Sequence, residues 1–148
     1  MTEPPDSSSD GATAAPFLGA LAIVVAIVIA VWLFNVFSSH ELTDEQQIGR
    51  AVVAQNDALQ RRDYADFRVF TCARQHGVES EIIAGQRDSS ASRGDRFVDE
   101  VARVVIDGDK ATADVTYHFD KDPDNKETVE IAFAREDGAW KVCSTGPD

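Results

Sequence analysis

The chain has 148 residues, enough for one compact domain with extensions, and a net charge of −12. All 14 Lys and Arg residues follow residue 40, yet residues 41–148 still carry 23 acids against those 14 bases, a net of −9. A surface with that charge repels phosphate groups, so we expect neither nucleic acid as a partner nor attraction of this region to anionic lipid headgroups.

The first segment, residues 1–15, consists mainly of Ser, Pro, Asp, Gly, Thr and Ala. It has too few apolar side chains to offset the entropy cost of ordering the backbone. We therefore predict a disordered tail, placed in the cytoplasm by the orientation argued below.

Residues 16–38 are predicted to form a single transmembrane helix, which makes the lipid bilayer a partner of this segment. Residues 17–34 are 18 apolar or small residues without a charge, and extending the run to residue 37 gives a helix of ~31 Å, close to the hydrocarbon thickness of a bilayer. Two alternatives stay open: a buried core helix, and a cleaved signal peptide. The absence of Lys and Arg before the apolar run argues against the second.

Three helices are predicted after residue 41. Thr43 and Gln46 have the spacing of a capping box, and apolar residues then recur at helical spacing: Ile48, Ala51, Val52 and Leu59. Asp63 can cap a second helix, which buries one face formed by Tyr64, Phe67, Phe70 and Ala73. A short third helix is predicted over residues 78–86, and the composition of residues 87–95 is typical of a loop.

After residue 95 the apolar period changes from that of a helix to the alternation of strands. Four strands are predicted, at residues 96–106, 111–120, 128–136 and 139–144. The segments between them contain turn-forming residues: 107–109, 121–127 and 137–138. Helices followed by an antiparallel meander indicate an α+β domain with the helices on one face of the sheet.

The chain contains two cysteines, Cys72 and Cys143. One disulfide between them would fit a domain on the oxidising side of a membrane, with the N-terminus in the cytoplasm. Two separate thiols in a cytosolic domain, or a reactive pair of Cys72 with His76, are the alternatives. The few basic residues after the apolar run weakly favour the opposite orientation.

The direction of Trp140 depends on the same strand. Cys143 shares a face of a regular strand with Ala139 and Lys141, whereas Trp140 takes the other face. If Cys72 lies on a helix that covers the sheet, Trp140 must point away from the helices. Otherwise the strand ends or bulges before Cys143.

Three stretches, "ALQRRDYADFRVFTCA", "VVIDGDKATADVTY" and "DGAWKVC", give residues 43–146 a resemblance to the nuclear transport factor 2-like superfamily. More narrowly, the chain is similar to actinobacterial single-pass membrane proteins with a small outer domain of unknown function. The resemblance implies that residues 41–148 form a cone of about three helices on a curved antiparallel sheet of about four strands, often enclosing a pocket.

Four residues are candidates for a pocket or for acid–base chemistry: Tyr64, Asp114, Tyr117 and His118. Asp114 and His118 share one strand face, but four residues along a strand separate them by ~13 Å, too far for a dyad. Asp120, Asp122 and Asp124 begin like a calcium loop, but Asn125 and Ile131 stand where Gly and Glu are required. We predict neither a metal nor a cofactor.

These observations favour a non-catalytic binding or assembly module, anchored in the membrane and facing the cell envelope. The partner would be an envelope protein, a second copy of the chain or a small apolar ligand. The alternative is a small pocket enzyme of isomerase, dehydratase or hydrolase type, which requires the candidate side chains to project into a closed apolar cavity.

Overall fold

The structure, a computed structural model, describes the backbone of residues 15–37 and 41–147 and the side chains of residues 21–33 and 41–147. The chain divides into two compact units, Met1–Glu41 and Leu42–Asp148. The predicted disordered tail lies outside the described residues, apart from residue 15.

The first unit contains one helix, α1 (Ala15–Phe37), which confirms that the apolar segment is helical. The apolar side chains described in it, within residues 21–33, are all exposed. Within the described part of the chain, no helix has both the length and the hydropathy needed to cross a bilayer.

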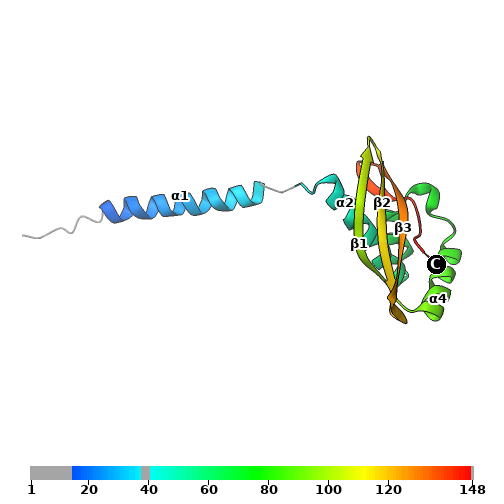
Figure 1. Cartoon of the computed structure of the whole chain (residues 1–148). Helices are drawn as coiled ribbons and strands as arrows, with labels where there is room; N and C mark the ends of the chain where they lie inside the picture. The colour runs from blue at the N-terminus through cyan, green and yellow to red at the C-terminus, as the bar shows by residue number, and fades with distance from the viewer. Residues whose placement is uncertain (1–14, 38–40, 148) are drawn as a thin grey trace, which may run out of the picture. The chain divides into compact units, whose positions relative to one another are not determined.

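The second unit contains a sheet of four antiparallel strands in the order β1-β2-β3-β4. The strands are β1 (Arg96–Asp107), β2 (Lys110–Phe119), β3 (Asp122–Glu136) and β4 (Ala139–Val142), as Figure 1 shows for the first three. The register shifts twice within β1, between Val98 and Glu100 and between Ala102 and Val105. Such bulges bend and twist a strand, so the sheet is curved. The predicted α+β meander is confirmed.

The core lies between the sheet and α2 (Asp44–Arg61). The predicted capping box is present, with the Gln46 N–H donating to Thr43 Oγ1 and the Thr43 N–H donating to Gln46 Oε1. The inner face of the sheet is the face against α2. It contributes alternate residues of the strands to one apolar cluster: Ala111, Ala113, Val115, Tyr117, Ile131, Phe133, Trp140 and Val142. Strand alternation and helical spacing thus place two apolar surfaces in contact.

Two further helices complete the three α-helices described in the second unit: α3 (Tyr64–Phe70) and α4 (Glu79–Arg93). Asp63 caps α3 as predicted, accepting the N–H of Asp66. A separate apolar cluster formed by Ala58, Leu59 and Phe67 joins α2 to α3, and Ile82 of α4 packs against it. α3 is shorter than predicted. It ends at Phe70, and Ala73, which was predicted on its buried face, belongs to a separate 3-10 turn, η1 (Ala73–Gln75).

The prediction of a loop over residues 87–95 is wrong, because α4 continues to Arg93. Its serines bond inside the helix: the Ser92 hydroxyl donates to the Asp88 carbonyl, and Gln86 Nε2 donates to Ser90 Oγ. The helix ends at Gly94, whose φ of +85° favours glycine. A Cβ there would also lie 1.6 Å from Asp120 Oδ1, so that exposed side chain would have to move.

The predicted turn over residues 121–127 is also wrong. The turn contains only Asp120 and Lys121, and β3 begins at Asp122, which pairs with Phe119. Pro123 lies beside a register irregularity between Tyr117 and Phe119, where its missing N–H breaks no regular ladder. Turn-forming residues were therefore a misleading signal in a long hairpin.

The N-terminus of α2 is attached to the last two strands through one carboxylate, that of Asp44. It accepts hydrogen bonds from Trp140 Nε1 at 3.0 Å and from the Arg135 guanidinium at 2.9 Å. The bond from Trp140, with the charge and hydrogen bond of Arg135, lowers the pKa of Asp44 despite some desolvation. The contribution of this carboxylate to stability is therefore present above the pKa of an unfolded Asp and is lost as the pH falls through its lower folded pKa.

The first testable prediction concerns two adjacent valines of α2. Val52 is fully buried in the core, whereas Val53 is 54% exposed. Val52→Ala should lower the free energy of unfolding by roughly 2 kcal/mol, because it removes buried methyl groups and leaves a cavity. Val53→Ala is the matched control and should change it by less than about 0.5 kcal/mol. Urea unfolding of the full chain measures both, and equal effects would show that this face of α2 is not the core.

Candidate functional site

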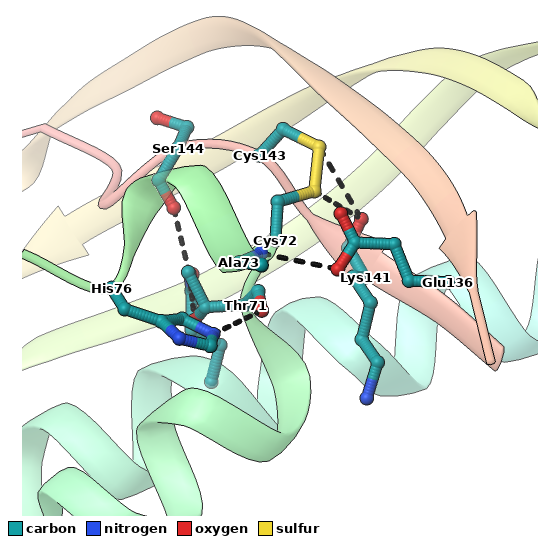
Figure 2. The surroundings of a disulfide bond; sticks show 9 residues. Thr71, Cys72, Ala73, His76, Glu136, Lys141, Cys143 and Ser144 are labelled. Atoms are coloured by element: carbon teal, nitrogen blue, oxygen red, sulfur yellow. Dashed lines mark hydrogen bonds between the residues drawn. A yellow bond between two sulfur atoms is a disulfide. The ribbon is translucent and has the colours of Figure 1, made fainter.

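Cys72 and Cys143 form a disulfide, with their Cα atoms 4.9 Å apart and a sequence separation of 71. Figure 2 shows the bond joining the segment after α3 to the segment after β4. The Cys72 N–H donates to the Val142 carbonyl at 2.8 Å, and Thr71 and Val142 form a parallel bridge. Cys72 therefore lies in extended backbone along the free side of β4.

This arrangement settles the direction of Trp140. Trp140 is 3% exposed and packs toward α2, as does Val142. Thr71, the bridge partner of Val142, is also buried, and its hydroxyl accepts a hydrogen bond from Gln55 Nε2 of α2 at 2.9 Å. By strand alternation the next residues, Cys72 and Cys143, point to the opposite face. The premise that Cys72 lies on a covering helix was wrong, and Trp140 faces the helices.

A groove of about 640 Å³ lies beside the disulfide on the face of the sheet away from α2. Its floor contains Val105, Thr112 and Ala132, which stand opposite one another on three neighbouring strands, and Ala134. The Cys143 N–H continues this row by donating to the Ala132 carbonyl at 2.8 Å. We call this the outer groove, and its remaining lining is Ala73, Arg74, Asp107, Lys110, Ala111, Phe133, Glu136 and Cys143.

The outer groove is mostly apolar, with charges of both signs along its border. Val105 is 63% exposed there, although it is a large apolar residue. Two cations, Arg74 and Lys110, and two carboxylates, Asp107 and Glu136, line the same space. The Glu136 carboxylate accepts the Ala73 N–H at 3.1 Å and so connects η1 to the end of β3. The groove thus combines uncovered methyl groups with a border of no net charge.

The four residues proposed for a pocket do not meet. Asp114 and His118 point to the outer face of β2, whereas Tyr117 is buried on the inner face. Tyr64 lies on α3, where its hydroxyl donates to the Gly77 carbonyl at 3.0 Å. The tyrosines and the two outer-face residues are therefore on different surfaces of the domain and cannot act on one substrate atom.

Each of the two outer-face residues has a separate partner. Asp114 forms an ion pair with Arg103. His118 Nδ1 lies 2.8 Å from Asp99 Oδ1, and Lys126 Nζ lies 3.4 Å from the other oxygen of that carboxylate. The Phe97 ring stacks on the imidazole at 5.0 Å between centroids. Desolvation opposes ionisation of Asp99, but His118 and Lys126 outweigh it and lower the pKa of that carboxyl.

Sequence reasoning missed the pairing of His118 with Asp99. The bulge between Val98 and Glu100 shifts the register of β1 by one residue, and spacing along a single strand does not reveal a shift of that kind. The arrangement orients the imidazole, as a carboxylate does in a catalytic pair. His118 is not part of the lining of the outer groove.

A second polar cluster was also missed, and it surrounds Arg96 inside the domain. The Arg96 side chain is 6% exposed and donates to Asn56 Oδ1 at 2.8 Å and to the carbonyls of Thr145 and Pro147 at 3.1 and 2.7 Å. Asn56 in turn donates to the Arg96 carbonyl. The guanidinium also lies 5.1 Å from the centroid of the Tyr117 ring. Burial raises the pKa of Tyr117, against the opposing charge of Arg96, so its hydroxyl stays protonated at neutral pH.

The acidic residues do not assemble a metal centre in the described part of the chain, where no group of three or more His, Cys, Asp and Glu side chains is placed to hold an ion. Asp120 is in the turn and Asp122 and Asp124 are in β3. No cofactor is implied by the residues of the outer groove.

No protein-family model and no curated protein matches the chain. Solved structures that it is similar to include a proposed dehydratase of the NTF2-like family from Streptomyces avermitilis, at 19% identity, 68% coverage of this chain, 91% of that chain and a TM-score of 0.45. A proposed NTF2-like transpeptidase from Campylobacter jejuni shares 16% identity. The match covers 63% of this chain and 94% of the transpeptidase, with a TM-score of 0.44. A protein of unknown function with a cystatin-like fold from Nostoc punctiforme shares 13% identity. The match covers 65% of this chain and 83% of that protein, with a TM-score of 0.47. Two of these three structures are described as NTF2-like.

The second prediction concerns the stability that the disulfide adds. Closing a loop between residues with a sequence separation of 71 restricts the unfolded chain, which corresponds to about 4 kcal/mol in the chain-entropy description. Reduction of the full chain should therefore shift its urea midpoint down by an amount equivalent to roughly 2–4 kcal/mol. The Cys72→Ala/Cys143→Ala variant should unfold at the midpoint of the reduced chain and should not respond to reductant. An unchanged midpoint on reduction would contradict the pairing.

Proposed function

We propose that this chain is a membrane-anchored, non-catalytic binding module of the cell envelope that holds a small, uncharged apolar ligand in the outer groove. The observation that carries the proposal is the groove itself, about 640 Å³ of uncovered apolar surface on an otherwise polar face of a domain whose core is already filled. Ligand sites typically enclose about 300–1,000 Å³ and combine apolar lining with a few polar groups.

The anchor is the apolar segment of residues 17–34. The apolar side chains described in α1 are exposed, and a helix with such a surface is unfavourable in water. A lipid bilayer would supply the apolar surroundings, and a helix of 23 residues has sufficient length for its hydrocarbon layer.

The orientation rests on the disulfide. Disulfides persist in oxidising compartments and are reduced in the cytosol. A domain that uses one to hold the segment after α3 against β4 is therefore proposed to lie outside the cytoplasm, with residues 1–15 inside.

The ligand class follows from the lining of the groove. Methyl groups of Val105, Thr112, Ala132 and Ala134 would exclude water around an apolar ligand, at about 25 cal/mol for each Å² buried. The positive charges of Arg74 and Lys110 are balanced by the carboxylates of Asp107 and Glu136, so the border strongly attracts neither anionic nor cationic ligands. An uncharged ligand also avoids the cost of desolvating a charge.

The alternative, a small pocket enzyme, is less well supported. It requires its acid, its base and an apolar cavity to meet, but Tyr117 lies on the opposite face of the sheet from Asp114 and His118. The residues that line the outer groove include none of these three. Binding without chemistry therefore accounts for more of the geometry.

The third prediction tests the groove directly. A small uncharged aryl diazirine, photolysed with the full chain in phospholipid nanodiscs, should label peptides that contain Val105 and Ala132, as located by mass spectrometry. Ala132→Phe fills the floor of the groove and should reduce this labelling at least fivefold. Thr128→Phe, also an exposed position on the same strand and face but outside the groove, should leave it unchanged. Labelling confined to α1 would refute the proposed ligand site.

The fourth prediction tests the orientation. Cells that produce the full chain are quenched in acid, free thiols are alkylated, and the peptides are separated without reduction. We expect Cys72 and Cys143 in one linked pair of peptides. Recovery of both as alkylated thiols would contradict the placement outside the cytoplasm, because the geometry of the folded domain brings the two residues together.

A further inference from the structure

We propose that the Cys72–Cys143 disulfide is a redox-sensitive cross-link that holds one side of the outer groove in place. A small thiol would break this cross-link by attacking the Cys143 sulfur from the groove. The inference rests on the proposed function, because it concerns the regulation of the same site. It starts from an asymmetry: Cys143 lines the groove and retains 8% exposure, whereas Cys72 is fully buried and is not part of the lining.

The chemistry is ordinary thiol–disulfide exchange. A thiolate RS⁻ bonds to the sulfur of Cys143, the bond between the two cysteine sulfurs breaks, and Cys72 leaves as a thiolate that takes a proton from water. A second molecule of the thiol then reduces the mixed disulfide, which yields the Cys143 thiol and the oxidised small molecule RSSR. The reductant is the small thiol itself, so two thiols are oxidised for each protein disulfide that is reduced.

The groove depends on the bond because the residues directly after Cys72 form part of its lining. Ala73 and Arg74 belong to η1, a turn of three residues without a side-chain hydrogen bond at its N-cap. Apart from the disulfide, two backbone N–H groups hold this segment to the sheet among the described residues: that of Cys72 donates to the Val142 carbonyl, and that of Ala73 donates to the Glu136 carboxylate. A segment held by so few bonds opens readily once the covalent link is lost.

Opening would remove Ala73 and Arg74 from one side of the groove and so weaken ligand binding. The coupling must also act in reverse, since two events that influence each other do so by the same free energy. A ligand that fills the groove should therefore protect the disulfide from reduction, and a side chain that fills it should do the same.

The experiment uses the full chain in phospholipid nanodiscs with reduced glutathione as the probe thiol. Samples are quenched in acid at early times, the free thiols are alkylated, and both cysteines are identified by peptide mass spectrometry. We expect glutathione on Cys143 and the alkyl group on Cys72, in at least tenfold excess over the reverse. Ala132→Phe should slow the reaction at least threefold, whereas Thr128→Phe should react like the natural chain.

Three results would overturn the inference. Glutathione on Cys72 would show that attack does not come from the groove, comparable amounts on both cysteines would indicate attack on unfolded chains, and equal rates for the two Phe variants would remove the groove from the pathway. Photolabelling separates this inference from the proposed function. Equal labelling of the oxidised and reduced chain refutes only the claim that the disulfide controls the groove. No labelling of the oxidised chain refutes the ligand site.

Discussion

The burial of one face of α2 in the curved sheet is the constraint from which the rest of the domain follows. The inner face of the sheet is covered by three residues of α2: Ile48, Ala51 and Val52. The aromatic side chains of Tyr117 and Phe133 on that face are therefore almost fully buried. Since this space is filled, α3 and α4 pack around a second, smaller cluster. The outer groove lies on the other face of the sheet, where Val105 and Ala132 are exposed.

The same alternation separates the two kinds of stabilisation in the domain. On β4, Trp140 and Val142 add to the apolar core, and the next residue turns outward and forms the disulfide. The hydrophobic burial of β4 and the covalent link directly after its end therefore lie on opposite faces of the sheet. Loss of the link can then loosen the segment after α3 while the core stays packed, which is what allows a local effect of reduction to be distinguished from unfolding.

Structural features that depend on residues close together in the sequence were predicted correctly. The capping box at Thr43, the cap at Asp63, the buried alternation of β2 and the turn at Asp137 all depend on neighbours within a few residues. Apart from the loop wrongly predicted over residues 87–95, the errors arise from pairing at long range. Pro123 is tolerated because of its place opposite β2, Cys72 lies beside β4 rather than on a helix, and His118 meets Asp99 through a bulge. The outer groove could not be foreseen, because its lining comes from three strands and a turn.

The two register shifts of β1 have a consequence for how neighbouring copies of the chain can associate. β1 is the outermost strand, and a regular outermost strand offers an unbroken row of N–H and C=O groups to which a neighbouring chain can add. The bulges at Val98 to Glu100 and at Ala102 to Val105 interrupt that row twice in 12 residues. Arg103, with a φ of +49°, turns the backbone out of the strand conformation at the second bulge. The irregularity that bends the sheet around α2 thereby also discourages strand addition between crowded copies, and so protects the protein against aggregation.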